Sequence, residues 1–177
     1  MIRGMGPSAV EDRERFSRLF EAHYARVLAF AERRVGRDLA DEVTAETFLL
    51  AWRRLDSVPP EPLPWLYGVA RNMVLRQLRV TSRQAEVHHL LANERPNLPV
   101  DDSEHDALWQ AFEQLSGPDR EILSLIAWEE LSVRDAARVL NVPASVFSVR
   151  LHRARRRLQR HLPWPASSTV PAIPETT

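Results

Sequence analysis

The sequence predicts an all-α fold of two small helical domains joined by a flexible acidic linker, the C-terminal one a helix-turn-helix. Apolar residues recur every three to four positions through most of the chain, glycine is scarce at 5 in 177 residues, and no segment alternates apolar and polar residues as a strand does. The expected bounds are 11–83 for the first domain, 84–105 for the linker, 106–162 for the second domain and 163–177 for a proline-rich, disordered tail.

Three helices are expected in the first domain. One apolar face runs from Phe16 to Ala31, and Gly36 follows it as a helix-ending residue. A second face runs from Leu39 to Leu55. Residues 57–64 contain four prolines and predict a loop, because proline lacks an N–H and disrupts a helix interior. The third helix is expected over residues 65–80.

Charge is segregated along the chain although the net charge is zero. Residues 62–85 contain four arginines and no acid, while residues 86–106 contain six acids and one arginine. From residue 136 to residue 162 there is again no acid, but eight basic residues lie between Arg138 and Arg160, counting His152. The chain has no lysine, and the planar arginine guanidinium suits contacts with phosphates and base edges. This pattern favours two nucleic-acid-binding domains on either side of a linker.

The second domain is expected to open with a helix around Leu108, a break at residues 116–118 and a further helix. Ser132 and Asp135 then fit a capping box, Ser-x-x-Asp, at the start of a short helix. The helix is expected to stop at residues 141–143, because asparagine tolerates the left-handed conformation.

A basic amphipathic helix follows this turn. Its expected buried stripe consists of Phe147, Leu151, Ala154 and Leu158, and arginines occupy most of its other faces. A short helix, a tight turn and a basic helix form the order of a helix-turn-helix, whose second helix enters the major groove of DNA. The alternative is a surface helix whose arginines are only solvated.

Composition excludes several function classes. The absence of cysteine rules out disulfides and thiolate metal sites, and no apolar run approaches the length of a membrane span or signal peptide. We therefore expect a cytoplasmic protein with no membrane insertion, no metal and no cofactor. A metal-dependent enzyme using His88, His89 and His105 is disfavoured, because these residues lie in or beside a segment without periodicity and no phosphate-binding loop or catalytic triad is visible.

Three segments resemble, in the same order, extracytoplasmic function (ECF) sigma factors, which give bacterial RNA polymerase its promoter specificity. Residues 38–55 are similar to the family's polymerase-binding helix, residues 64–72 to its promoter-melting helix, and residues 131–155 to its promoter-binding helix-turn-helix. Two departures stand out: Ser148 replaces a basic residue that is common there, and Asn141 replaces a common glycine. The main alternative is a helix-turn-helix regulator with a ligand-sensing or dimerising N-terminal domain, which would not need the acidic helix or the first arginine-rich block.

The resemblance implies a transcription initiation factor, not an enzyme, that is a monomer when free and binds core RNA polymerase, promoter DNA and an anti-sigma factor. It assigns polymerase binding to Asp41, Glu42 and Glu46. The alternative is that these acids form an ordinary solvated helix face. It assigns recognition of the minus-ten element to Trp65, Arg71, Asn72, Arg76 and Arg79. Asn72 is expected to read a flipped base. For Trp65, a place in the protein core is favoured over stacking on a base. It assigns minus-thirty-five bases to Ser148, Val149, His152 and Arg153, and phosphates to Arg150, Arg155 and Arg156.

Overall fold

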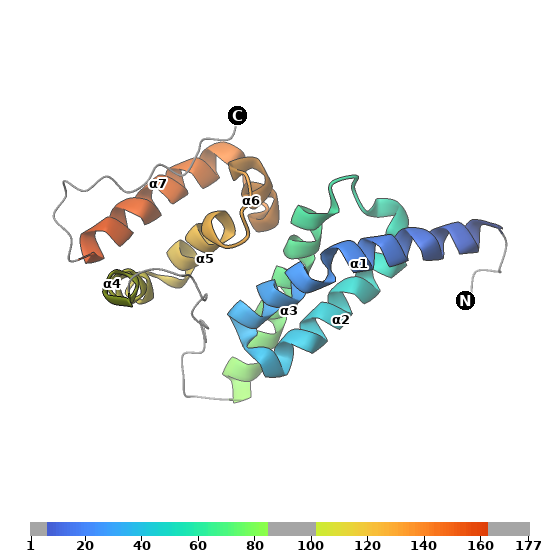
Figure 1. The fold of residues 1–177 in the computed structure, drawn as a ribbon, viewed down its shortest axis with the longest axis horizontal. Helices are drawn as coiled ribbons and strands as arrows, with labels where there is room; N and C mark the ends of the chain where they lie inside the picture. The colour runs from blue at the N-terminus through green and yellow to red at the C-terminus, as the bar shows by residue number, and fades with distance from the viewer. Residues whose placement is uncertain (1–6, 85–101, 163–177) are drawn as a thin grey trace. The chain divides into compact units, whose positions relative to one another are not determined.

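The computed structural model describes residues 7–84 and 102–162, which form helices and no strand. The all-α prediction is confirmed. The chain divides into two compact units, the first containing α1–α3 and the second α4–α7 (Figure 1). None of the helices in the described ranges combines the length and apolar character needed to cross a membrane.

The first unit consists of α1 (Pro7–Val35), α2 (Arg37–Arg53), a 3₁₀ turn (Leu55–Ser57) and α3 (Pro62–Gln84), and each of the three α-helices packs on the other two. Gly36 lies between α1 and α2 with a φ of 73°, a left-handed conformation that favours glycine. Its N–H donates to the Glu32 carbonyl at 2.9 Å, so the expected end of the first helix is confirmed. The core of this unit includes Val27, Phe30, Val43, Phe48, Ala51, Leu66, Tyr67 and Ala70.

The loop expected over residues 57–64 is wrong in its last three residues, because α3 begins at Pro62. Pro62 and Pro64 therefore lie in the first helical turn. Backbone N–H groups in that turn have no intrahelical acceptor, so proline loses no hydrogen bond there, and its fixed φ suits the helix. Only the stretch before Pro62 behaves as the proline content predicts.

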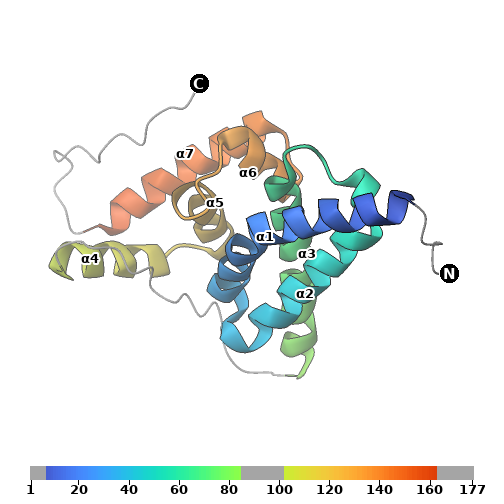
Figure 2. The same cartoon turned by 45° about the vertical axis from the view of Figure 1, so that its right-hand side comes forward.

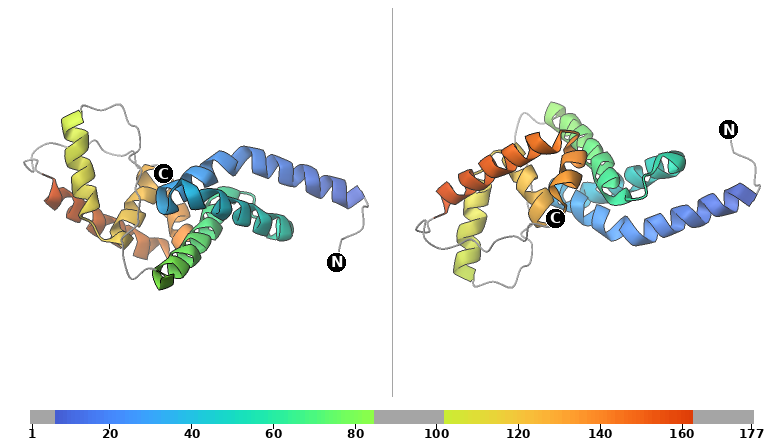
Figure 3. Two further views of the ribbon diagram at one scale, coloured as in Figure 1. Left: turned by 90° about the horizontal axis from the view of Figure 1, so that it is seen from below. Right: turned by 90° about the horizontal axis from the view of Figure 1, so that it is seen from above.

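The second unit consists of α4 (Asp102–Glu113), α5 (Gly117–Ala127), α6 (Val133–Leu140) and α7 (Ala144–His161). The long α7 packs on each of the other three helices, with α4 near its C-terminal end (Figures 2 and 3). Because α4 begins at Asp102, the expected linker of residues 84–105 extends too far. The first turn of a helix makes few internal hydrogen bonds and need not be apolar, so the helix extends beyond its apolar face. Residues 85–101 and the tail 163–177 lie outside the described residues.

Two serines cap helices of the second unit with the same Ser-x-x-Asp pattern. Ser132 precedes α6 and its Oγ accepts from the Asp135 N–H at 3.1 Å, which confirms the expected cap. Ser116 precedes α5 and accepts from the Asp119 N–H at 3.3 Å, a cap that the sequence reading missed. In both pairs the serine hydroxyl also donates to the aspartate Oδ2 at 2.7 Å.

Candidate nucleic-acid interface

The turn between α6 and α7 is built from local hydrogen bonds. Asn141 adopts the left-handed conformation expected of it, with φ 53° and ψ 48°. Its N–H donates to the Arg138 carbonyl at 3.1 Å, and the Val142 N–H donates to the Ala137 carbonyl at 3.0 Å. Pro143 then precedes the first turn of α7. This sharp stop and restart sets α7 as a separate helix against α6, in the order that a helix-turn-helix requires.

One stripe of α7 anchors the helix in the domain core. Phe147 and Ala154 are fully buried and Leu151 is nearly so, while Leu158 is half-buried at the helix end. These positions lie within about 60° of one another at about 100° per residue. The opposite face of α7 therefore points away from the rest of its unit.

All seven predicted DNA-contacting residues of α7 are exposed: Ser148, Val149, Arg150, His152, Arg153, Arg155 and Arg156. Helical geometry places Val149 and Arg156 opposite the buried stripe, with His152 and Arg153 to either side. Arg150 and Arg155 lie on the two flanks. The Ser148 hydroxyl donates back to the Ala144 carbonyl at 3.0 Å, so it is partly engaged within the helix.

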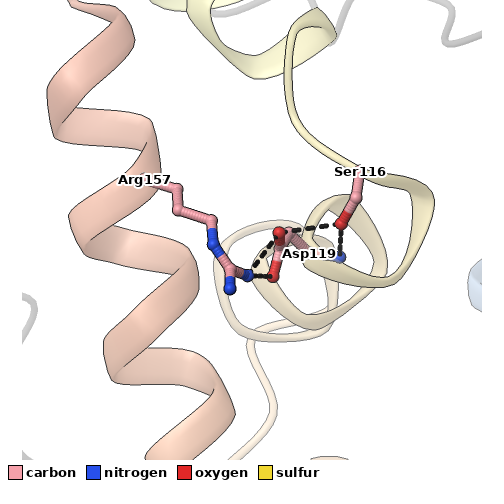
Figure 4. Close-up of polar contacts among 3 residues, drawn as sticks. All are labelled: Ser116, Asp119 and Arg157. Atoms are coloured by element: carbon pink, nitrogen blue, oxygen red, sulfur yellow. Dashed lines mark hydrogen bonds and ion pairs between the residues drawn. The ribbon is translucent and has the colours of Figure 1, made fainter.

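Arg157 differs from the other arginines of α7 in the contacts among described residues, because it is bound within its own domain. Its Nη1 lies 2.7 and 2.8 Å from the two carboxylate oxygens of Asp119 on α5 (Figure 4). The Asp119 side chain is only 9% exposed and also accepts from the Ser116 hydroxyl. The sequence reading missed this pair. The Ser-x-x-Asp pattern could have indicated the cap, but no sequence signal joins residues 38 positions apart.

The structure places four of the five predicted minus-ten residues on one outward stripe of α3. Trp65, Asn72, Arg76 and Arg79 are spaced by seven, four and three residues, which brings them within about 40° of the same direction. Asn72, Arg76 and Arg79 are exposed and Trp65 is half-buried. The fifth residue, Arg71, is half-buried and lies about 100° around the helix from Asn72, so it does not share this stripe.

The predicted polymerase-binding residues lie on α2. Asp41 and Glu42 are exposed, and Glu46 is half-buried one turn after Glu42 on the same side. Two large apolar side chains of α2 are also exposed, Leu49 by 48% and Trp52 by 43%. The sequence reading did not single them out, although Leu49 falls outside the apolar period of the helix.

No cluster of three or more potential metal ligands occurs in the part of the chain that the structure describes. Residues 88 and 89, named in the metal-site alternative, lie outside the described ranges, as does the side chain at position 105. The described residues therefore offer charged helix faces and no cluster of potential metal ligands.

Comparison with family models finds two matches, one in each unit. Residues 19–84 match Sigma-70 region 2, and residues 105–158 match Sigma-70, region 4. The first match covers most of α1 and all of α2 and α3, and the second covers α4 to α7 almost completely. Both helix-rich units are thus matched independently.

Individual relatives agree with these matches. The RNA polymerase sigma factor NccH of Alcaligenes xylosoxydans xylosoxydans is 30% identical over 169 residues, which cover 85% of this chain and 88% of NccH. The ECF RNA polymerase sigma factor BldN of Streptomyces coelicolor is 31% identical over 159 residues, which cover 84% of this chain but only 60% of BldN. The ECF RNA polymerase sigma factor SigM of Bacillus subtilis is 29% identical, with 70% of this chain and 79% of SigM covered.

Two solved structures share the fold. The sigma factor RpoE of Bartonella quintana, crystallised with the anti-sigma factor NepR, superposes with a TM-score of 0.60 at 24% identity, covering 83% of this chain and 96% of RpoE. CnrH, in complex with the cytosolic domain of CnrY, superposes with a TM-score of 0.56 at 25% identity, covering 82% and 85% of the two chains. With both sigma regions present in the family's order, the chain belongs to the ECF sigma factor family.

Proposed function

We propose that this protein binds core RNA polymerase and directs promoter-specific transcription initiation, using region 4 for the minus-thirty-five element and region 2 for the minus-ten element. The observation that carries the proposal is that each matched region presents an exposed basic stripe on one helix, α3 in region 2 and α7 in region 4. Arginines on such stripes neutralise phosphates and position the protein on DNA.

In region 4, α7 is the recognition helix. Ser148, Val149, His152 and Arg153 lie in its first half, the part that a helix-turn-helix inserts into the major groove, and they contact bases. Arg150, Arg155 and Arg156 contact phosphates. The burial of Phe147, Leu151 and Ala154 supports this assignment, because it fixes which side of α7 remains available to DNA.

In region 2, the outward stripe of α3 holds the opened minus-ten strand. A base that leaves the stack needs a hydrogen-bonding group to read it, and the exposed Asn72 provides a donor and an acceptor. Arg76 and Arg79 lie along the same stripe and hold the phosphates, with Trp65 at its N-terminal end. Arg71 belongs to the flank of this site, since it is half-buried and lies about 100° around the helix from Asn72.

Polymerase binding uses the exposed side of α2. Asp41, Glu42 and Glu46 supply negative charge that steers encounter with a basic surface of the polymerase. The protein acts as a monomer in the cytoplasm, where its partners are the core enzyme, promoter DNA and an anti-sigma factor, and it contributes no catalytic residue or cofactor. A relative supports the last partner, since the Bartonella quintana RpoE structure is a complex with an anti-sigma factor.

Run-off transcription tests the proposal directly. Purified core polymerase is combined with a library of promoter fragments, with and without this protein. The expected result is transcription that depends on the protein and that selects fragments sharing two short elements. Equal transcription with and without the protein, together with no retention of the protein on core polymerase at physiological salt, would refute the sigma-factor function.

A further inference from the structure

Val149 is an apolar residue on a polar and basic face of α7. Its side chain is 50% exposed, and it lies opposite the stripe that anchors the helix in the core. Of its four neighbours at one helical turn, Ser145, His152 and Arg153 are exposed and polar or basic, and the fourth is Val146. Val149 therefore stands at the centre of the surface assigned to base contacts.

Folding of the domain gains little from a valine at this position. Valine loses side-chain freedom in a helix and forms helices less readily than alanine or arginine. The exposed half of the residue also gains no burial within the domain, since it remains in water. Any favourable contact of the exposed part of Val149 must come from a molecule outside the domain.

We propose that Val149 reads the 5-methyl group of a thymine in the minus-thirty-five element. This inference rests on the sigma-factor function proposed above. In the major groove only thymine presents a methyl group, and the other base edges present hydrogen-bond donors and acceptors. Valine has no polar atom to pair with those groups, so an A·T pair with its thymine facing Val149 is favoured over the alternatives.

The charge around Val149 fits DNA as the occupant. Arg153 and Arg156 follow at one and two helical turns, and both are exposed. Neither forms an ion pair within the described residues, in contrast to Arg157. A base contact from Arg153 and a phosphate contact from Arg156 would hold α7 in the groove and press the Val149 side chain against the base edges.

Val146 provides a matched control, because it is the same residue type on the same helix. It is 38% exposed, but it lies within about 20° of the direction of Arg157, which turns toward Asp119 on α5. Val146 thus lies on the same flank of α7 as Arg157, and further along the helix that flank contacts α5 of the same unit. It is not expected to contact a base.

The experiment removes the methyl group without changing any hydrogen bond. Core polymerase and this protein first select promoters from a library randomised over the minus-thirty-five element. The selected promoters are then resynthesised with one thymine of that element at a time, on either strand, replaced by deoxyuridine. At one position the change should lower run-off transcription about fourfold, the effect of burying one methyl group. Val149→Ala should lose most of this thymine preference, and Val146→Ala should retain it. Alanine raises helix propensity, so both variants should fold, which circular dichroism checks.

Three results would overturn the assignment: equal transcription of thymine and uracil templates at every position, a full methyl effect in Val149→Ala, or its loss in Val146→Ala. Selected elements without any thymine would overturn it as well. Failure of the sigma-factor function is distinguishable, because transcription would then not depend on the protein and the library would yield no preferred element. Transcription that depends on the protein but not on the methyl group contradicts only the role of Val149.

Discussion

Replacing Arg157 by methionine should destabilise the second unit by removing the ion pair that joins α7 to α5. Methionine keeps an unbranched apolar stem of similar length and removes the guanidinium alone. The Arg157 Nη1 lies 2.7 and 2.8 Å from the two oxygens of Asp119, whose side chain is 9% exposed, while the Arg157 side chain is 51% exposed. The substitution therefore leaves a nearly buried carboxylate that accepts one side-chain hydrogen bond, from the Ser116 hydroxyl, and has little contact with water (Figure 4).

The expected cost follows from this mixed exposure. Removing one partner of a fully buried pair costs about 3–5 kcal/mol, and exposed pairs contribute about 0–1 kcal/mol. Because the arginine is half in water and the aspartate keeps one hydrogen bond, we expect about 1–2 kcal/mol. In a domain of this size each kcal/mol lowers the melting temperature by roughly 4–8 °C, so the transition of the second unit should fall by about 5–15 °C.

Thermal unfolding of the full chain, followed by circular dichroism, measures this effect. A double-mutant cycle with Asp119→Asn should give a coupling energy of about 1 kcal/mol between the two residues. Arg156→Met is the matched control, since Arg156 is exposed and the substitution should change stability by no more than about 0.5 kcal/mol. The reasoning is refuted if Arg157→Met melts like the parent, or if its effect is unchanged when Asp119 is already replaced.

Three further predictions concern the other unit and the DNA contacts. Asn72→Ala should impair promoter opening, measured by permanganate reactivity, more than polymerase binding, measured by pull-down; normal opening would contradict the base-reading role of Asn72. Arg153→Ala should relax base preference at one or two minus-thirty-five positions, whereas Arg156→Ala should weaken binding to all promoters alike and reduce the slope of log affinity against log salt concentration by about one unit. Library transcription at several salt concentrations separates the two effects. Unchanged base preference in Arg153→Ala would show that α7 is placed in the wrong register on DNA. Burial, and secondarily the charge of Arg26, lowers the pKa of His23, so the unfolded chain takes up the proton first and the free energy of unfolding should decrease as the pH falls below about 6.5. In denaturant titrations, the free energy of unfolding of His23→Gln should depend less on pH than that of the parent. An identical pH dependence would exclude His23 as its source.

Much of the second unit follows from signals contained in a few neighbouring residues. The spacing of Phe147, Leu151 and Ala154 predicts a buried stripe, and the structure buries all three. Ser132 predicts a cap and Asn141 a left-handed turn, and both predictions are confirmed. These features are local, because a cap, a turn or a helical stripe depends on the hydrogen bonds and geometry of one continuous segment.

Where local signals compete, the sequence reading failed at the ends of helices. Prolines at 62 and 64 predicted a loop but lie in the first turn of α3, and α4 begins at Asp102, inside the expected linker. Both errors have one cause: the first turn of a helix needs few internal hydrogen bonds and tolerates residues that its interior excludes. An apolar period marks the packed part of a helix and not its ends.

The sequence by itself determined the helical class, the family resemblance and the candidate residues on α2, α3 and α7. Only the tertiary structure decided how those residues are divided. It turned Arg157 toward Asp119 and left Leu49 and Val149 exposed. The physical reason is that periodicity defines the faces of each helix separately, whereas the contacts between helices, 38 residues apart for Asp119 and Arg157, exist only once those faces have packed.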